Sequence, residues 1–150
     1  MSAARQWFVG GASALFLLLC PVVGQAGGTQ GATVKVRVGQ FRSTDGFLGY
    51  RLVFTPAAFP EGPGKEMRRS VQGERGVCTF TDLPAGTYAV SVMHDENGNG
   101  KLDKGVFGIP KEGYGVSNNK TYAMAAPKWS ESKFSLGAGE TKTLSIRLRY

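Results

Sequence analysis

Cysteine is scarce in this chain of 150 residues, which contains only Cys20 and Cys78. Cys20 lies in an apolar N-terminal run that we expect to be removed, and Cys78 alone cannot form an internal disulfide. The fold must then be stabilised by its own hydrophobic core. Cys78 alternates in phase with Phe80, so we expect a buried, unreactive thiol rather than a nucleophile.

Histidine is scarcer still, because His94 is the only one in the chain. One histidine without a second soft ligand makes a poor transition-metal site, and neither a nucleophile–base pair nor a carboxylate dyad is visible. We therefore expect no enzyme activity and no catalytic residues. His94 lies in phase with Val90 and Val92, so we expect its ring to be buried and to donate to a carbonyl group of segment 105–132. The alternative role, a general base, would require a substrate cleft beside it.

Acidic residues are outnumbered, with 11 Asp and Glu against 18 Lys and Arg, for a formal net charge of +7. The basic residues are spread thinly, and the densest point is the pair Arg68-Arg69. Nucleic-acid binding domains instead concentrate their positive charge in patches or stripes. We expect no nucleic-acid partner and attribute the excess to solubility and weak attraction to envelope polymers and membrane surfaces.

The one long apolar run stands at the N-terminus. A short polar start containing Arg5 precedes WFVGGASALFLLLCPVV (7–23), and the small residues Gly24 and Ala26 occupy the two positions that a signal peptidase inspects. This arrangement predicts a secretory signal peptide over residues 1–26, cleaved after Ala26.

The mature chain, residues 27–150, is predicted to be a single domain without a transmembrane span, in the periplasm or outside the cell. Two alternatives exist. An uncleaved anchor is disfavoured because the apolar run is short for a bilayer and no basic stop comes after it. A lipid-modified Cys20 is disfavoured because Leu19 stands where a lipoprotein carries a small residue.

Sustained helical periodicity is missing, and alternation with a period of two dominates instead. In TVKVRV, for example, Val34, Val36 and Val38 share one face of the predicted strand. Short runs rich in β-branched and aromatic residues, separated by Gly, Pro and Asp, predict strands at 33–38, 47–54, 65–71, 76–80, 87–94, 133–136 and 144–150. This pattern predicts an all-β protein, an antiparallel immunoglobulin-like or prealbumin-like β-sandwich. Glycines in LGAGETKTL predict a hairpin between its last two strands.

The segment 105–132 shows no alternation and is predicted to form one long irregular loop. Its aromatic residues are interspersed with glycines, and a structureless stretch of this length is usually functional. Tyr114, Tyr122 and Trp129 could line a groove for a carbohydrate or a peptide. They could equally close the open end of the sandwich, since a small domain needs that apolar area.

The stretch LPAGTYAVSVMHDENGNGKLD (83–103), followed by GIPKEGYGVSNN (108–119), resembles a family of small exported bacterial proteins. The family is catalogued as domain-of-unknown-function family 2141. FTDLPAGTYAVSV also resembles the strand–turn–strand of prealbumin-like domains, such as the B-type repeats of collagen adhesins and the regulatory domains of carboxypeptidases. The resemblance implies a signal peptide, a small sandwich and an envelope location, and it implies no activity.

Within that stretch, DENGNGKLD resembles the ligand spacing of an EF-hand-type calcium loop. Side-chain oxygens stand at loop positions 1, 3, 5 and 9, glycine stands at position 6 and a backbone carbonyl serves at position 7. The predicted ligands are Asp95, Asn97, Asn99, the carbonyl of Lys101, and Asp103. Leu102 occupies position 8, where such loops anchor to the core.

Position 12 lacks the bidentate glutamate of strong sites, because Val106 stands there. Glu112 could replace it only if the chain folds back, and Glu96 should point away from the ion. With two well-placed carboxylates, calcium would bind weakly, with a Kd of about 10⁻⁴ to 10⁻³ M. The alternative is a metal-free turn, because Asn and Asp side chains also cap backbone N–H groups in turns.

Taken together, these patterns predict an exported cell-envelope protein, a non-enzymatic binding or structural module with a weak calcium loop. Its expected partner is an envelope protein, a peptide or a glycan. The alternative is a carbohydrate- or peptide-binding module that uses the aromatic residues of segment 105–132, with the 95–103 loop as a metal-free turn.

Overall fold

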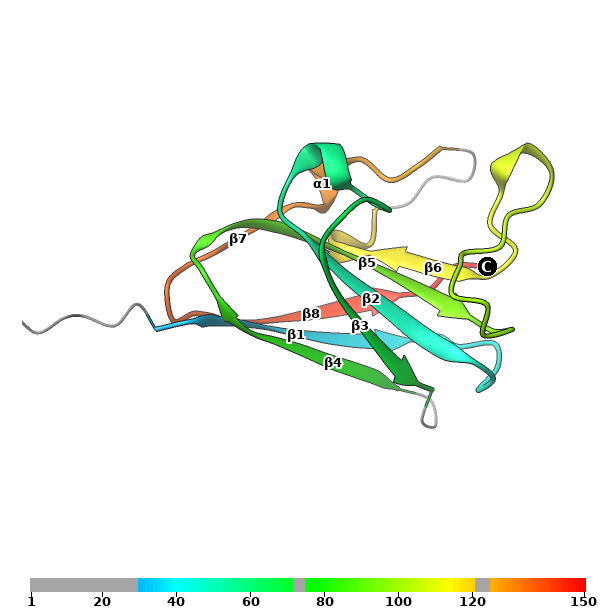
Figure 1. Cartoon of the computed structure of the whole chain (residues 1–150), viewed down its shortest axis with the longest axis horizontal. Coiled ribbons are helices and arrows are strands. Elements are labelled where there is room, and N and C mark those ends of the chain that lie inside the picture. The colour runs from blue at the N-terminus through cyan, green and yellow to red at the C-terminus, as the bar shows by residue number, and fades with distance from the viewer. Residues whose placement is uncertain (1–29, 72–74, 121–124) are drawn as a thin grey trace, which may run out of the picture.

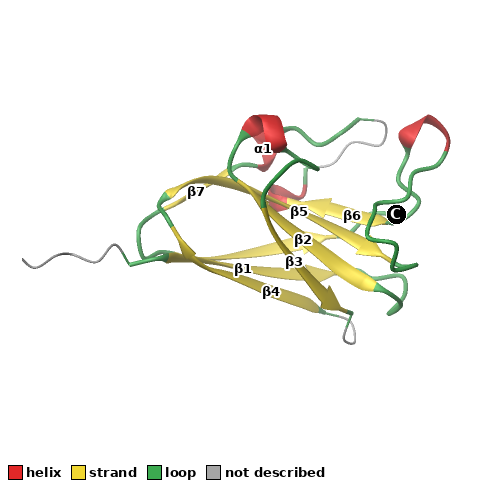
Figure 2. Cartoon of the chain, viewed as in Figure 1, coloured by secondary structure: helices red, strands yellow, loops and turns green. Residues whose placement is uncertain are grey.

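The computed structural model describes residues 30–71, 75–120 and 125–150 and shows two β-sheets packed face to face (Figures 1 and 2). The predicted signal peptide, residues 1–26, and Tyr122 lie outside the described residues. The prediction of an all-β sandwich is confirmed for the described part of the chain.

The smaller sheet has three strands in the order β4-β1-β8. These strands are β1 (Ala32–Gly39), β4 (Gly76–Leu83) and β8 (Thr141–Arg147). β1 pairs with β4 in antiparallel fashion but with β8 in parallel fashion, so the sheet is mixed. The prediction of a wholly antiparallel sandwich is therefore wrong at the β1–β8 pair.

The larger sheet has the order β3-β2-β5-β6, and β7 also pairs with β5. Its strands are β2 (Phe47–Val53), β3 (Lys65–Ser70), β5 (Gly86–Asp95), β6 (Gly113–Val116) and β7 (Phe134–Leu136). Because β7 joins this sheet and β8 joins the other, the turn between them crosses from sheet to sheet. The hairpin predicted there is wrong, since the same glycine-rich turn serves a hairpin and a crossover equally well.

Four short helical turns complete the described chain: η1 (Pro56–Ala58), η2 (Val106–Gly108), η3 (Ser117–Asn119) and α1 (Trp129–Ser132). No helix among the described residues is both long and apolar enough to cross a membrane.

The core lies between the two sheets and is built by the alternating positions of their strands. In β1, Val34, Val36 and Val38 are at most 2% exposed, whereas Lys35 and Arg37 between them are exposed. The predicted inward face of this strand is thus confirmed. Leu48, Tyr50, Leu52, Phe80, Leu83, Tyr88, Val90, Val92, Ile146 and Leu148 complete most of this core. Each fully buried aliphatic or aromatic side chain contributes roughly 1.5–3 kcal/mol, which replaces the disulfides that the sequence lacks.

Cys78 is buried in this core, as its phase with Phe80 predicts. Burial raises the pKa of its thiol, and its sulfur lies 3.3 Å from the sulfur of Met67. A nucleophilic cysteine needs an accessible thiolate. Cys78 therefore acts as a small apolar side chain.

The segment 105–132 is not one irregular loop, because it contains β6 and the turns η2, η3 and α1. Strand β6 escapes detection because its sequence, GYGV, has no apolar alternation. Its glycines are required because neighbouring residues pack closely against them. A Cβ at Gly113 would lie 2.6 Å from the ring of Tyr150, and one at Gly115 would lie 2.7 Å from the carbonyl oxygen of Arg147. The glycine-rich sequence of β6 therefore reflects contacts with residues that are distant in the sequence.

Candidate metal site and the adjacent groove

The 95–103 loop begins at Asp95, the last residue of β5. The alternation that buries His94 between the sheets turns Asp95 to the outer face of the larger sheet, where it is nevertheless 1% exposed. Its Oδ2 accepts a hydrogen bond of 2.8 Å from the amide of Gly100 and one of 3.1 Å from the guanidinium of Arg68. Gly98 and Gly100 have φ values of 76° and 80°, and this left-handed backbone lets the loop curl over the carboxylate.

The other predicted ligand side chains form one cluster across the loop. The side-chain NH₂ groups of Asn97 and Asn99 donate to the two carboxylate oxygens of Asp103, at 2.6 and 3.0 Å. The side-chain oxygen of Asn97 also accepts from the backbone N–H of Asn99, and the side-chain oxygen of Asn99 accepts from the backbone N–H of Lys101. These last two bonds are Asx-turns, the turn chemistry of the metal-free alternative. The structure therefore brings Asn97, Asn99 and Asp103 together.

One oxygen in this loop has no partner. Oδ1 of Asp95 is buried and accepts no hydrogen bond, although Oδ2 of the same carboxylate is fully engaged. A buried unpaired carboxylate oxygen is costly, and native proteins rarely keep one without a function. Among the described residues no three His, Cys, Asp or Glu side chains gather into a metal-ligating group. A cation here would therefore depend on amide and backbone oxygens besides the two aspartates.

Glu112 does fold back to the loop, but it binds the backbone. It is 4% exposed, and its two carboxylate oxygens accept from the amides of Glu96 and Asp103, each at 2.9 Å. Glu112 thereby holds the beginning and the end of the loop together. Position 12 itself supplies no side-chain oxygen, because the apolar Val106 stands there and is 74% exposed.

Glu96 points away from the loop interior, as its place between ligand positions predicts. Its carboxylate accepts hydrogen bonds from the guanidinium of Arg42 and from the hydroxyl of Ser43. The hydrogen bond from Arg42 lowers the pKa of the Glu96 carboxyl. Glu96 thus ties the loop to the segment before β2 and is not a candidate ligand.

His94 is completely buried, but the partner predicted for it is wrong. Its Nε2 lies 2.8 Å from the carbonyl oxygen of Asp45 and its Nδ1 lies 2.8 Å from the hydroxyl of Tyr150. A carbonyl can only accept, so Nε2 carries the proton and Nδ1 accepts from the tyrosine. The ring therefore pins the segment before β2 and residue 150, not the segment 105–132. The register between β2 and β5 explains the contact with Asp45. Leu48 lies opposite His94, and so residue 45, just before β2, comes close to the ring.

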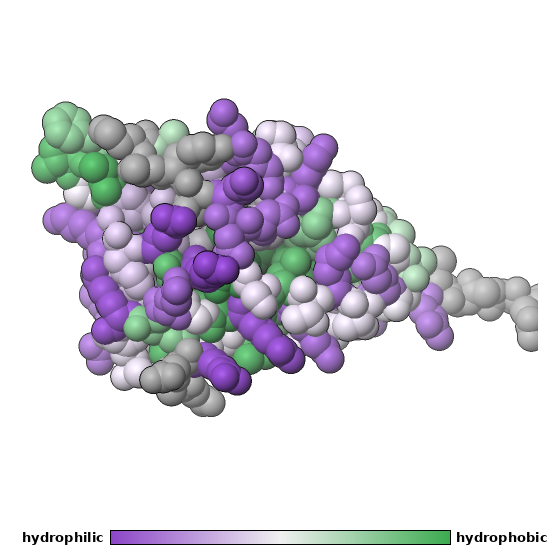
Figure 3. Space-filling view, turned by 180° about the vertical axis from the view of Figure 1, so that it is seen from behind, coloured by the Kyte–Doolittle hydropathy of each residue, from purple (hydrophilic) through white to green (hydrophobic). Residues whose placement is uncertain are grey.

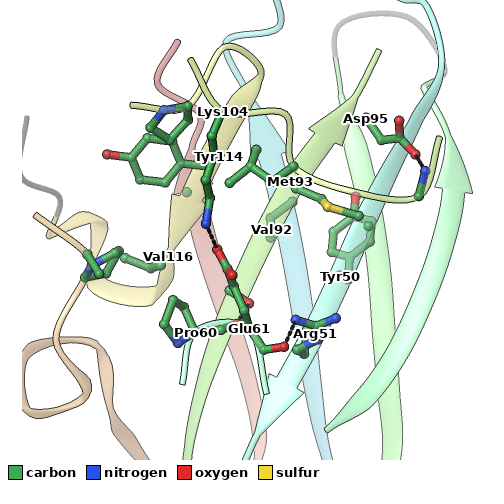
Figure 4. A pocket seen from close by; sticks show the side chains of 18 of the residues that line it. Tyr50, Arg51, Pro60, Glu61, Val92, Met93, Asp95, Lys104, Tyr114 and Val116 are labelled. Atoms are coloured by element: carbon green, nitrogen blue, oxygen red, sulfur yellow. Dashed lines mark hydrogen bonds and ion pairs between the residues drawn. The ribbon is translucent and has the colours of Figure 1, made fainter. Parts of the chain in front are cut away.

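A groove of about 530 Å³ lies on the outer face of the larger sheet, beside the 95–103 loop (Figure 4). Residues of four strands line it, among them Arg51 of β2, Arg68 of β3, Met93 of β5 and Tyr114 of β6. Apolar residues of the surrounding loops also line it: Pro60, Leu102, Phe107, Ile109, Pro110, Ala125, Ala126 and Pro127. Leu102 therefore faces this groove and is not a member of the main core cluster, contrary to the core anchor that we predicted.

Charged residues form ion pairs at the rim of the groove. Lys104 of one loop pairs with Glu61 of another at 2.7 Å, and the sticks in Figure 4 show this pair beside Tyr114 and Pro60. Arg51 pairs with Glu66 at 2.7 Å and donates to the carbonyl oxygen of Glu61 at 2.6 Å. These exposed pairs stabilise the fold little, but they fix where charge lies around an apolar floor.

Of the three aromatic residues predicted to form a groove, the structure describes Tyr114 and Trp129 and places only Tyr114 in the groove. Tyr114 lines the groove, Tyr122 lies outside the described residues, and Trp129 is not among the lining residues. The Trp129 ring packs edge-on against Phe59, with ring centroids 6.0 Å apart. Reasoning from the sequence missed Met93, whose signal was an apolar side chain on the outward face of a strand.

Comparison with known proteins gives one match. The family model described as an uncharacterized protein conserved in bacteria (DUF2141) matches residues 36–144, from β1 into β8, and so spans both the 95–103 loop and the groove. No curated protein and no solved structure matches the chain. The chain belongs to the DUF2141 family of bacterial proteins.

Proposed function

We propose that this protein is an exported, non-enzymatic binding module on a prealbumin-like sandwich, and that its 95–103 loop binds calcium. The observation that supports the calcium site is the unpartnered, buried Oδ1 of Asp95. A hard divalent cation is the ligand that compensates such an oxygen best, because it accepts carboxylate and amide oxygens alike.

The proposed ligands are Oδ1 of Asp95, the side-chain oxygens of Asn97, Asn99 and Asp103, and the carbonyl of Lys101. The bonds from the side-chain amides of Asn97 and Asn99 to the carboxylate of Asp103 keep these three side chains close to one another before a cation enters. An amide oxygen has two lone pairs, so it can hold an Asx-turn and a cation at once. The metal-free turn and the calcium site are then two states of one loop.

Affinity is expected to be low, because only two carboxylates contribute and the guanidinium of Arg68 already neutralises part of the Asp95 charge. At about 10 mM calcium and a Kd of about 10⁻⁴ to 10⁻³ M, binding stabilises the protein by about 1.4–2.7 kcal/mol. We therefore expect the melting temperature of residues 27–150 to rise by about 4–10 °C between EDTA and calcium, measured by calorimetry. An unchanged melting temperature would contradict the calcium site.

The second candidate function is recognition of a peptide or a glycan in the groove. The observation that favours it is an apolar floor with charged residues at the rim, which is the composition of ligand sites. Of the two ligand classes, a peptide segment with apolar side chains fits better. Most of the apolar lining is aliphatic or proline, for example Pro60, Leu102 and Ile109, and such a lining accommodates the apolar side chains of a peptide.

Placing a charge on the groove floor tests this function. Binding of the protein to arrays of peptides and envelope glycans should fall about tenfold or more in Met93→Lys, because its ammonium would occupy apolar space. The matched control is Val77→Lys, which makes the same change at an exposed apolar strand position of the other sheet. Trp129 fluorescence reports binding independently, since its ring packs on Phe59 next to Pro60 of the groove wall. Equal binding by both variants would exclude the groove.

A further inference from the structure

A second unexplained feature is an apolar tip, residues 105–110, which comes after the 95–103 loop. The tip projects from the body of the molecule at the upper right of Figure 1, and the same projection is the green corner of Figure 3. Val106 is 74% exposed, Phe107 is 90% exposed and Ile109 is 43% exposed. Exposed apolar side chains that gather at one place, unlike scattered ones, mark interaction sites.

Backbone hydrogen bonds hold the tip in a defined conformation. The amide of Gly105 donates to the carbonyl of Ile109 at 2.7 Å, and the amide of Lys111 donates to the carbonyl of Asp103 at 2.8 Å. The backbone of Phe107 has a φ of 61°, in the left-handed region that a bulky side chain adopts only against strain. The fold would be served better by a glycine or an asparagine at this position. A strained backbone that holds a phenylalanine in solvent points to a role outside the fold.

The base of the tip is basic. Lys101, Lys104 and Lys111 are exposed around it, and Asp103 is the one acidic residue between positions 100 and 111. Lys104 pairs with Glu61 of another loop, so Lys101 and Lys111 carry most of the positive charge available at this base. The carboxylate of Asp103 is turned inward to Asn97 and Asn99. An apolar point surrounded by lysines combines the two attractions that hold proteins at anionic membrane surfaces.

Shape and size favour a lipid surface over a protein partner. Val106, Phe107 and Ile109, of which the last two also line the edge of the groove, offer far less than the roughly 800 Å² per partner of a stable protein interface. A fluid bilayer needs no matching cavity, and its anionic headgroups complement the lysines. We propose that the tip inserts Val106 and Phe107 into an anionic lipid surface, while the lysines at its base bind the headgroups. This inference does not rest on the calcium site.

Vesicle sedimentation in EDTA tests the proposal, because EDTA removes any bridging of carboxylates to lipid by calcium. We expect residues 27–150 to sediment with phosphatidylcholine vesicles that contain phosphatidylglycerol, and to stay in solution with phosphatidylcholine alone. Phe107→Ser should weaken binding about tenfold to a hundredfold, because the variant loses the burial of one phenyl ring. Lys111→Gln should weaken it about fivefold, the contribution of one lysine near an anionic surface.

The matched control is Phe54→Ser, which removes another exposed phenylalanine, at 56% exposure, outside the tip. This variant should bind vesicles like the unchanged protein. The proposal is overturned if neither vesicle binds the protein, or if Phe107→Ser binds as well as Phe54→Ser. It is also overturned if, without lipid, the protein forms dimers that Phe107→Ser abolishes, since a second copy would then be the partner of the tip.

Discussion

Replacing Asp95 by asparagine should abolish the response of the protein to calcium while changing its calcium-free stability by about 1 kcal/mol or less. Asparagine keeps an oxygen that accepts from the amide of Gly100, and the lost ion pair to Arg68 involves a half-exposed side chain. What disappears is the carboxylate charge, which Arg68 compensates only in part and which Oδ1, without a hydrogen-bond partner, would present to the cation. Melting curves in EDTA and in calcium should then coincide for Asp95→Asn, whereas those of the unchanged protein differ by about 4–10 °C.

The control for this variant stands at the next position. Glu96→Gln removes the same charge from the same loop, but its carboxylate faces Arg42 and Ser43. It should therefore retain the full calcium shift. If Asp95→Asn and Glu96→Gln respond to calcium alike, the effect of the ion is non-specific charge screening and the proposed ligand set is wrong.

The second large effect is expected at Glu112. Glutamine at this position would keep one acceptor and would turn an N–H group toward a backbone amide that now donates to the carboxylate. Because both bonds are charge-assisted and buried, Glu112→Gln should lower the free energy of unfolding by about 2–4 kcal/mol in EDTA. Denaturant unfolding without calcium measures this loss directly.

The calcium response separates the two roles that Glu112 could have. As a brace it sets calcium-free stability, and a calcium shift should persist in Glu112→Gln. As a ligand it would leave calcium-free stability unchanged and the calcium shift would vanish. Glu140→Gln is the matched control, since Glu140 also accepts from a backbone amide, that of Gly137, but is 40% exposed. This control should cost no more than about 1 kcal/mol.

Local patterns were sufficient to predict every described strand except β6. Alternation in the sequence placed Val34, Val36 and Val38 in the core and put Cys78 beside them, and both predictions are confirmed. The reason is that a strand sends successive side chains to opposite faces, so the buried face is written into every second residue. The same rule turned Asp95 to the face of β5 opposite to that of His94.

Contacts between distant segments were decided by the tertiary structure alone. No local pattern shows that β8 lies parallel to β1, that GYGV pairs with β5 as a strand, or that His94 binds Asp45 and Tyr150. The groove likewise needs four strands and three loops to meet before Met93 and Tyr114 face one space.

The 95–103 loop shows both kinds of information at once. Its spacing determined which oxygens would be available, because ligand positions in a tight turn depend on sequence separation. Whether each oxygen is free or taken depends on partners from elsewhere in the chain. Arg68 binds Oδ2 of Asp95, whereas Oδ1 has no hydrogen-bond partner. Glu112, which follows the 105–110 tip in the sequence, accepts a hydrogen bond from the backbone of the loop. Hydrogen-bond satisfaction is a property of the packed molecule, and only the fold could decide it.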